Sequence, residues 1–180
     1  NMRNSVTFYN FVGIGENASD HIVSSYDYVD AVVPVLRYLD NETIVGVADN
    51  RLMFYSGSKK PVSISDVLLS ENIVGVYTDS SNVGLLFYDN TGENKYRLDL
   101  YEKSGKMVSS YSFDMDFKDI LIHNGQIMIY NENQCVVVDS NGVEKFSGFF
   151  ESSVLYLSAT ESKKKYIAVT KDAIETLAFE

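Results

Sequence analysis

Short runs of alternating apolar and polar residues, separated by turn residues, extend along the whole chain. A period of two is typical of β-strands, and no stretch of roughly 10 to 12 residues carries a convincing helical period. The sequence therefore predicts an all-β protein of about seventeen strands. The expected strands are 6–11, 22–28, 32–39, 43–47, 52–55, 62–69, 73–77, 83–88, 96–101, 107–113, 120–122, 126–130, 134–138, 144–149, 154–157, 166–170 and 174–179.

Turn signals stand between most of these runs. Asn124-Gly125 and Asn141-Gly142 separate alternating apolar segments, and Asn-Gly in that position is a strong hairpin signal. The segments 89–92 and 103–106 each carry a glycine where a turn needs a positive φ. Tight antiparallel hairpins are therefore expected throughout.

An aromatic signature recurs at a fixed spacing. Phe8-Tyr9, Phe54-Tyr55 and Leu100-Tyr101 follow one another at intervals of 46 residues, each inside a strand-like run. Sheets of four antiparallel strands with a period of roughly 40 residues are typical of propeller blades. We expect a partial β-propeller of about four blades, with a β-sandwich or another stacked-sheet repeat as the alternative.

The strand order divides the chain into units within one propeller-like domain, 1–180. Residues 4–30 hold the last two strands of a preceding blade. Three four-stranded blades follow at 31–70, 71–116 and 117–150, and 151–180 forms an incomplete three-stranded blade. A blade is apolar on both faces and must stack on neighbours. We therefore expect the open ends of such a stack to be covered either by blades from upstream sequence or by another copy of the chain, in a homodimer.

Composition narrows the class of partner. The 45% hydrophobic and 22% charged residues fit a folded, soluble chain, and no run is apolar and long enough to span a membrane. Net charge is −10, which repels phosphate backbones, so we expect no nucleic acid partner and no membrane contact by this segment. The single cysteine, Cys135, precedes three valines and is expected in the core.

Several segments resemble a family of unknown function from Gram-positive bacteria. They are 5–11, 26–28 leading to Val32-Val33-Pro34, 96–101 with the turn through Gly105, and 144–148 with Phe150-Glu151. The chain resembles the C-terminal half of that family, without the anchor and the N-terminal blades. The resemblance implies an extracytoplasmic, propeller-like domain that is membrane-anchored in the full-length protein.

Residues for catalysis or metal binding do not gather in a recognisable pattern. His21 and His123 are the only histidines and lack the spacing of a transition-metal site. The segments 89–93 and 139–142 place Asp and Asn near glycine but do not complete a calcium loop, so we interpret them as hairpin turns. Catalytic residues, cofactor and metal ligands are therefore expected to be absent.

Two groups of side chains keep functional alternatives open. Five tyrosines provide amphipathic contacts for a protein or cell-wall ligand, or pack between blades; they are Tyr26, Tyr28, Tyr38, Tyr77 and Tyr88. Four carboxylates, Asp27, Asp30, Asp40 and Asp49, lie near one strand and could serve glycoside cleavage, with a solvated edge as the more ordinary interpretation. The favoured hypothesis is a non-catalytic extracytoplasmic scaffold. The alternative is half of a polysaccharide-acting enzyme whose site needs further blades.

Overall fold

Antiparallel β-strands make up almost all of the regular structure. The structure is a computed structural model that describes residues 3–12, 17–89, 91–162 and 164–178. Its strands are β1 (Arg3–Tyr9), β2 (Ile22–Val29), β3 (Val35–Tyr38), β4 (Thr43–Ala48), β5 (Arg51–Ser56), β6 (Val62–Leu68), β7 (Ile73–Thr78), β8 (Asn82–Tyr88), β9 (Tyr96–Glu102), β10 (Met107–Phe113), β11 (Asp119–His123), β12 (Gln126–Tyr130), β13 (Gln134–Val138), β14 (Glu144–Phe149), β15 (Val154–Ala159), β16 (Lys165–Thr170) and β17 (Ile174–Ala178). Within the described residues a single 3₁₀ turn, η1 (Ala18–His21), is the only helical element. The prediction of an all-β chain is confirmed.

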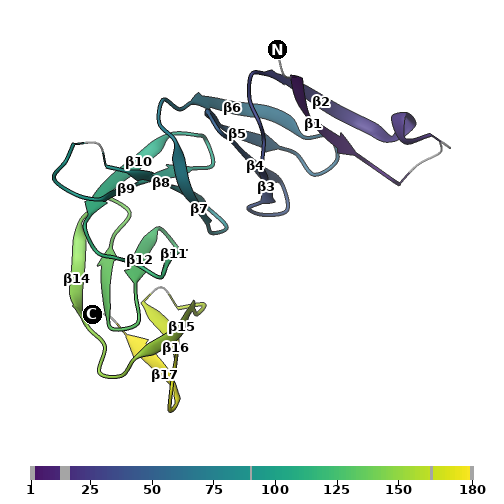
Figure 1. The fold of residues 1–180 in the computed structure, drawn as a ribbon. Helices are drawn as coiled ribbons and strands as arrows, with labels where there is room; N and C mark the ends of the chain where they lie inside the picture. The colour runs from purple at the N-terminus through teal and green to yellow at the C-terminus, as the bar shows by residue number, and fades with distance from the viewer. Residues whose placement is uncertain (1–2, 13–16, 90, 163, 179–180) are drawn as a thin grey trace. The chain divides into compact units, whose positions relative to one another are not determined.

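These strands form five sheets in which neighbours in sequence are neighbours in space (Figure 1). The sheets are β1-β2, β3-β4-β5-β6, β7-β8-β9-β10, β11-β12-β13-β14 and β15-β16-β17. This up-and-down order needs only hairpin connections, which the turn residues of the sequence supply. None of the helices in the described ranges is long and apolar enough to cross a membrane.

The chain divides into two compact units, which are described separately. The first unit comprises residues 1–73 and the turn 103–106, and the second comprises 74–102 and 107–180. The first unit therefore contains the sheets β1–β2 and β3–β6. The second contains the other three sheets, apart from the 103–106 turn.

The first unit is held together by packing between its two sheets. Val6, Phe8 and Tyr28 from β1 and β2 form one buried cluster with Ile44 and Tyr55 from β4 and β5. All six residues of β4 are buried, and two of them, Ile44 and Ala48, belong to this cluster.

In the second unit the β11–β14 sheet is covered on both faces. One face packs against β8 and β9 through a cluster that includes Leu86, Leu98 and Ile129. The other packs against β15 and β16 through a cluster that includes Tyr130, Val137 and Tyr166. Within each unit, successive sheets therefore bury their apolar faces against one another, which is the packing that a stacked-sheet repeat requires.

The recurring aromatic signature marks equivalent strands. Phe54-Tyr55 lies in β5 and Leu100-Tyr101 in β9, each the third strand of its sheet, and Phe8-Tyr9 lies in β1. Phe8, Phe54, Tyr55, Leu100 and Tyr101 are all buried, so the signature is mainly a core signature. Tyr9 departs from this rule because it is 45% exposed.

Several strand boundaries differ from the prediction, and two of the differences have a clear local reason. The first strand ends at Tyr9 rather than Phe11, because the Asn10 amide instead donates to the His21 carbonyl at 2.8 Å and the chain then turns. The third strand begins at Val35 rather than Val32, directly after Pro34, which has no amide hydrogen for a ladder. The Asn124-Gly125 hairpin is confirmed: both residues have positive φ, 51° and 76°.

Candidate ligand-binding groove

A hollow of about 460 Å³ opens on the first unit and is lined mainly by aromatic and apolar side chains. We call it the aromatic groove. Its lining residues are Phe8, Tyr9, Asn10, Phe11, Val12, Val23, Tyr38, Ser58, Lys59 and Pro61. They come from β1 and the residues after it, from β2, from the end of β3 and from the loop between β5 and β6. The groove therefore gathers side chains that are far apart in sequence.

Two stacked rings form one wall of the aromatic groove. The rings of Tyr9 and Phe11 are nearly parallel, at 6°, with their centroids 5.9 Å apart. Phe11 also lies 5.4 Å from the His21 ring, yet it is 73% exposed. The neighbouring strands bury their aromatic rings, whereas the Phe11 ring remains exposed to solvent. Such exposure of a large apolar side chain is unusual.

Hydrogen bonds around Asn10 hold this wall in place. The Asn10 side-chain oxygen accepts the Val12 amide at 2.9 Å, and the Asn10 carbonyl lies 3.0 Å from Nδ1 of His21. The turn directs Phe11 away from the sheet because its neighbours are tied back to the hairpin. Hydrogen bonds of Asn10 and Val12, the residues before and after Phe11, thus hold the exposed Phe11 ring in this position.

The opposite wall is the loop 58–61, which β2 anchors. Ser24 Oγ and the Tyr26 hydroxyl donate to the Pro61 carbonyl at 2.7 and 3.1 Å, and the Ser63 amide donates to the same tyrosine oxygen at 3.1 Å. The buried Phe8 ring forms the base and meets Tyr55 edge-on, with centroids 5.1 Å apart. Both walls and the base are therefore fixed to the core of the first unit.

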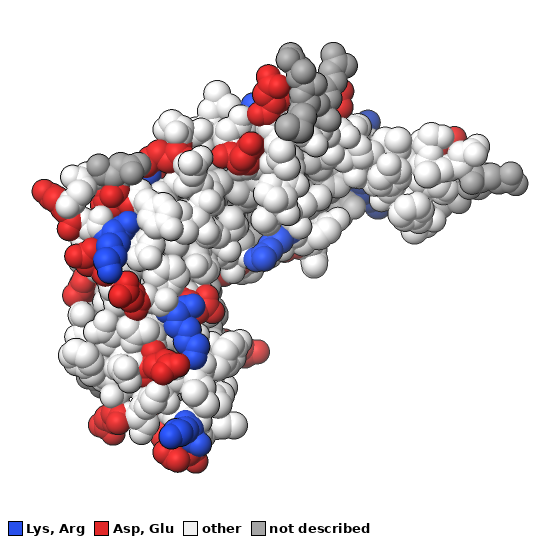
Figure 2. Space-filling model, viewed as in Figure 1, with Lys and Arg blue, Asp and Glu red and all other residues white. Residues whose placement is uncertain are grey.

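Charge is sparse at the aromatic groove. Among the described residues that line it, Lys59 is the only charged one, in a chain of net charge −10. In the view of Figure 2, the surface over the β1–β2 hairpin is largely uncharged. Such a surface suits a ligand that offers apolar or ring faces, and Lys59 favours one that also carries negative charge.

The five tyrosines predicted from sequence have different environments. In the first unit, Tyr38 lines the aromatic groove and is 70% exposed. Tyr26 anchors the 58–61 loop, while Tyr28 is buried with its hydroxyl 2.5 Å from that of Tyr55 and the Arg51 guanidinium over its ring. Burial raises the pKa of Tyr28 and Tyr55, and the hydrogen bond between them raises that of Tyr55 further.

The remaining two tyrosines belong to the second unit. Tyr77 packs against the cluster between β8–β9 and β11–β13, and burial raises its pKa. Tyr88 is 60% exposed and stacks on Tyr96, with centroids 5.8 Å apart. Their part in binding stays a prediction.

Sequence reasoning missed Tyr9 and Phe11 as candidate binding residues. In the predicted strand 6–11, Tyr9 and Phe11 at positions i and i+2 would project to the same side, and Phe8 to the other. That alternation was the available signal, but the prediction used Tyr9 only as part of the repeat signature and named neither residue as a binding residue.

Two of the four carboxylates suggested for glycoside cleavage lie too far apart to act as a pair. Asp40 and Asp49 lie at opposite ends of β4, a strand of six residues, so about 20 Å of extended chain separates them. Catalytic carboxyl pairs lie roughly 5 to 10 Å apart, so these two cannot form one. Asp27 is exposed on β2, and Asp30 occupies a positive φ of 55°.

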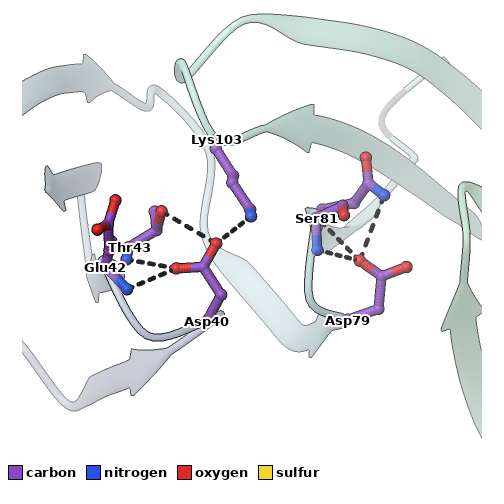
Figure 3. Close-up of polar contacts among 7 residues, drawn as sticks. Asp40, Glu42, Thr43, Asp79, Ser81 and Lys103 are labelled. Carbon is purple, nitrogen blue, oxygen red and sulfur yellow. Dashed lines mark hydrogen bonds and ion pairs between the residues drawn. The ribbon is translucent and has the colours of Figure 1, made fainter.

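The carboxylates near turns bind their own backbone. Oδ1 of Asp40 accepts the amides of Glu42 and Thr43 at 2.8 and 2.6 Å, and Oδ2 faces Lys103 Nζ (Figure 3). The hydrogen bond from Lys103 and those two amides hold the pKa of the Asp40 carboxyl well below its usual range. In the second unit Oδ1 of Asp79 accepts the amides of Ser81 and Asn82, both at 2.7 Å (Figure 3).

The segments compared with calcium loops are also turns. Oδ1 of Asp139 accepts the amides of Asn141 and Val143 at 2.9 and 3.0 Å, and Oδ2 pairs with Lys145 at 3.0 Å. Oδ1 of Asp89 accepts the Thr91 amide at 2.9 Å; Asn90 lies outside the described residues. Within the described parts of the chain, no three His, Cys, Asp or Glu side chains gather as metal ligands would.

Comparison with known sequences gives one family. Residues 1–179 match the profile of a family of unknown function, DUF5711. No curated protein matches the chain in sequence.

Comparison with solved structures shows the fold. The computationally designed Ika4 protein is similar at a TM-score of 0.54 and 11% identity, over 85% of this chain and 94% of that one. BamB from Moraxella catarrhalis is similar at 0.52 and 12%, over 84% of this chain and 48% of BamB. BBS1N in complex with ARL6DN is similar at 0.54 and 8%, over 85% of this chain and 55% of that one. The fold is therefore of the propeller type, and the chain spans about half the length of BamB and BBS1N.

Proposed function

We propose that this chain, which belongs to the family of unknown function DUF5711 and has a propeller-type fold, is a non-catalytic scaffold. It holds a ligand in the aromatic groove. The ligand is a cell-wall polymer or a protein. The groove carries this proposal, because the hydrogen bonds of Asn10 and Pro61 and the stacking of Tyr9 on Phe11 hold its lining in place before any ligand arrives. Preorganised rings lose little conformational entropy on binding, which favours affinity.

The chemistry of the groove supports a cell-wall polymer first. Tyr9, Phe11 and Tyr38 offer ring faces, while Asn10 and Ser58 offer hydrogen-bonding groups beside them. Sugar rings combine apolar faces with hydroxyl edges and match both kinds of group. Lys59 adds a positive charge that suits an anionic polymer. Nucleic acid fits less well, because the chain as a whole repels a phosphate backbone.

The proposal also concerns the cellular location of the protein and the division of the chain into domains. The domain acts on the extracytoplasmic side of a membrane, to which the full-length protein is anchored. The likeness of segments such as 5–11 and 96–101 to membrane-anchored proteins supports this location. Residues 1–180 form a single domain, in which each four-stranded sheet is one blade.

Binding to purified cell-wall material tests the groove. We expect the 180-residue chain to sediment with sacculi from a Gram-positive bacterium, and Phe11→Ala and Tyr38→Ala each to weaken that binding about tenfold. Sacculi stripped of anionic polymers separate the two sources of affinity: loss of binding assigns it to the anionic polymer, and retained binding assigns it to the glycan.

The matched control is Phe149→Ala, because Phe149 is 80% exposed but lies in the second unit. This variant should bind as the unaltered chain does. Tyr88→Ala tests whether the tyrosines of the second unit contribute. If Phe11→Ala and Tyr38→Ala bind sacculi with unchanged affinity, the aromatic groove is not the site.

A further inference from the structure

A second hollow lies within the second unit and is lined by residues of β13 to β17 and of the loop after β14. Its volume is about 210 Å³, below the roughly 300 to 1,000 Å³ of pockets that take drug-sized molecules, so it suits a small group. Phenylalanine rings, carboxylates and small buried side chains line it; they include Cys135, Phe146, Phe150, Glu151, Ala168 and Glu175. We call it the acidic hollow.

Small residues keep this space open between the two sheets. Cys135, predicted in the core and 1% exposed, pairs with Gly148 of β14 and shares a buried cluster with Ala168 of β16. These three positions carry little or no side-chain volume. The Phe146 ring lies over Gly148, since a Cβ on that glycine would be 2.6 Å from Cζ of Phe146. The ring therefore forms one side of a space that neither sheet fills.

A carboxylate stands on the inward face of the edge strand β17. Leu157 pairs with Ala168 and Ala168 with Glu175, so the three side chains share one face of the sheet. Leu157 and Ala168 are buried against β12 and β13, whereas Glu175 is exposed at the edge. Glu151, in the loop after β14, adds a second carboxylate to the lining. Two acidic side chains thus border a hollow whose other walls are apolar.

The lining of the acidic hollow does not balance this negative charge. Among the described residues that line it there is no lysine, arginine or histidine. Lys145 of β14 pairs instead with Asp139, at 3.0 Å. Lys165 precedes the inward-facing Tyr166, so it lies on the opposite side of the β15–β17 sheet. The acidic hollow therefore favours a ligand with positive charge.

We propose that the acidic hollow binds an organic ammonium group on a short apolar stem. A phenyl ring attracts such a cation through its quadrupole, the carboxylates offset its charge, and the stem covers the apolar surface beside Cys135 and Ala168. A metal ion fits less well, because in the parts of the chain that the structure describes no three His, Cys, Asp or Glu side chains gather as ligands. The aromatic groove includes Lys59 and suits the opposite charge, so the two sites are separate.

Titration of the isotope-labelled 180-residue chain with choline, followed by NMR, tests the proposal. Choline carries a trimethylammonium group on a short stem. We expect it to shift the amide signals of Glu151 and Ala168 with a Kd on the order of 1 mM, because so small a ligand makes few contacts. The uncharged analogue, in which a tert-butyl group replaces the trimethylammonium group, should bind at least about tenfold more weakly.

Two variants separate charge from ring. Glu175→Gln keeps the shape of the side chain and should weaken choline binding about tenfold, and Phe146→Leu keeps its apolar character and should weaken binding about threefold. Glu161→Gln is the control, because Glu161 is an exposed carboxylate of the same unit outside the lining. Phe11→Ala, which tests the aromatic groove, should also leave choline binding unchanged, so the two proposals succeed or fail separately.

Three results would overturn the proposal. The first is that choline shifts no signal of the acidic hollow, and the second is that the uncharged analogue binds as tightly as choline. The third is that calcium binds more tightly and displaces choline, which would assign the carboxylates to a metal ion. If Phe146→Leu fails to fold by circular dichroism, Glu175→Gln still decides the question, because Glu175 is exposed on an edge strand.

Discussion

Individual polar residues in this chain act mainly as turn stabilisers. One carboxylate oxygen of Asp40 closes the β3–β4 turn, and the other faces Lys103. Asp79 and Asn131 repeat the first of these patterns, since Oδ1 of each accepts the amides of the second and third residues after it. An acidic or amide residue at these positions therefore has a structural reason to be there.

Asp40 gives the chain an acid-sensitive contact. Its pKa is lowered in the folded state, so the ionised carboxylate stabilises the fold at any pH above the ordinary value of about 4. That contribution is lost as pH falls through the lower, folded-state pKa. Asp40→Asn should therefore lower the melting temperature at pH 7, and the difference from the unaltered chain should shrink in strong acid.

Thermal melts of both chains between neutral and strongly acidic pH measure this effect. Lys103→Met should follow the same pH dependence, because it removes the hydrogen bond that does most to lower the pKa of the Asp40 carboxyl. Asp27→Asn, at an exposed position of β2, is the control and should melt like the unaltered chain near neutral pH. A difference for Asp40→Asn that stays constant down to strong acid would contradict the assignment.

Strands and turns are the scale at which the sequence was most informative. The strands 107–113, 126–130, 134–138 and 144–149 were predicted to the residue, because turn residues such as Gly105, Asn124-Gly125 and Asn141-Gly142 mark where the chain reverses. The aromatic groove was predicted only through Tyr38. Tyr9, Tyr38 and Lys59 meet because two sheets stack, and local patterning contains no information on which distant residues such stacking brings together.

The β13–β14 turn requires glycine for two reasons: the backbone has a positive φ, and there is no space for a side chain. Gly142 has a φ of 78°, and a Cβ there would lie 2.8 Å from the Ser110 carbonyl oxygen. Gly92 has a similar φ of 81° but open space around it. Gly92→Ala should therefore cost about 1 kcal/mol of unfolding free energy, and Gly142→Ala about 2 to 4 kcal/mol.

Urea unfolding of the two variants measures that difference directly. Both share the strain of a positive φ, so the excess for Gly142→Ala reports the close approach of β10 to the turn. Equal losses of stability would show that the turn moves away from Ser110 without cost.

At the scale of the whole molecule, buried tyrosine side chains make the stability of both units sensitive to alkaline pH. Burial raises the pKa of several tyrosines, among them Tyr28, Tyr55, Tyr77, Tyr111, Tyr130 and Tyr166. The first two belong to the first unit and the others to the second. A phenol that stays protonated in the folded chain but ionises at about pH 10 when unfolded favours unfolding above that pH.

Phenolate absorbance during an alkaline titration should therefore rise in two stages. Tyrosines with ordinary exposure ionise first, and the buried set ionises only as the chain unfolds, together with loss of the circular dichroism signal of the sheets.

Tyr166 is a suitable single test, because burial raises its pKa to about 12 and its hydroxyl donates to Gln126 at 2.8 Å. Tyr166→Phe should cost about 1 kcal/mol at neutral pH, through the lost hydrogen bond, but should show a smaller loss of stability between about pH 10 and 12 than the unaltered chain. Tyr38→Phe, at a 70% exposed position, is the control and should leave the alkaline transition where it is. If all thirteen phenols titrate in one step while the sheets remain intact, water reaches the buried tyrosines, and the tight packing of sheet on sheet inside each unit is wrong.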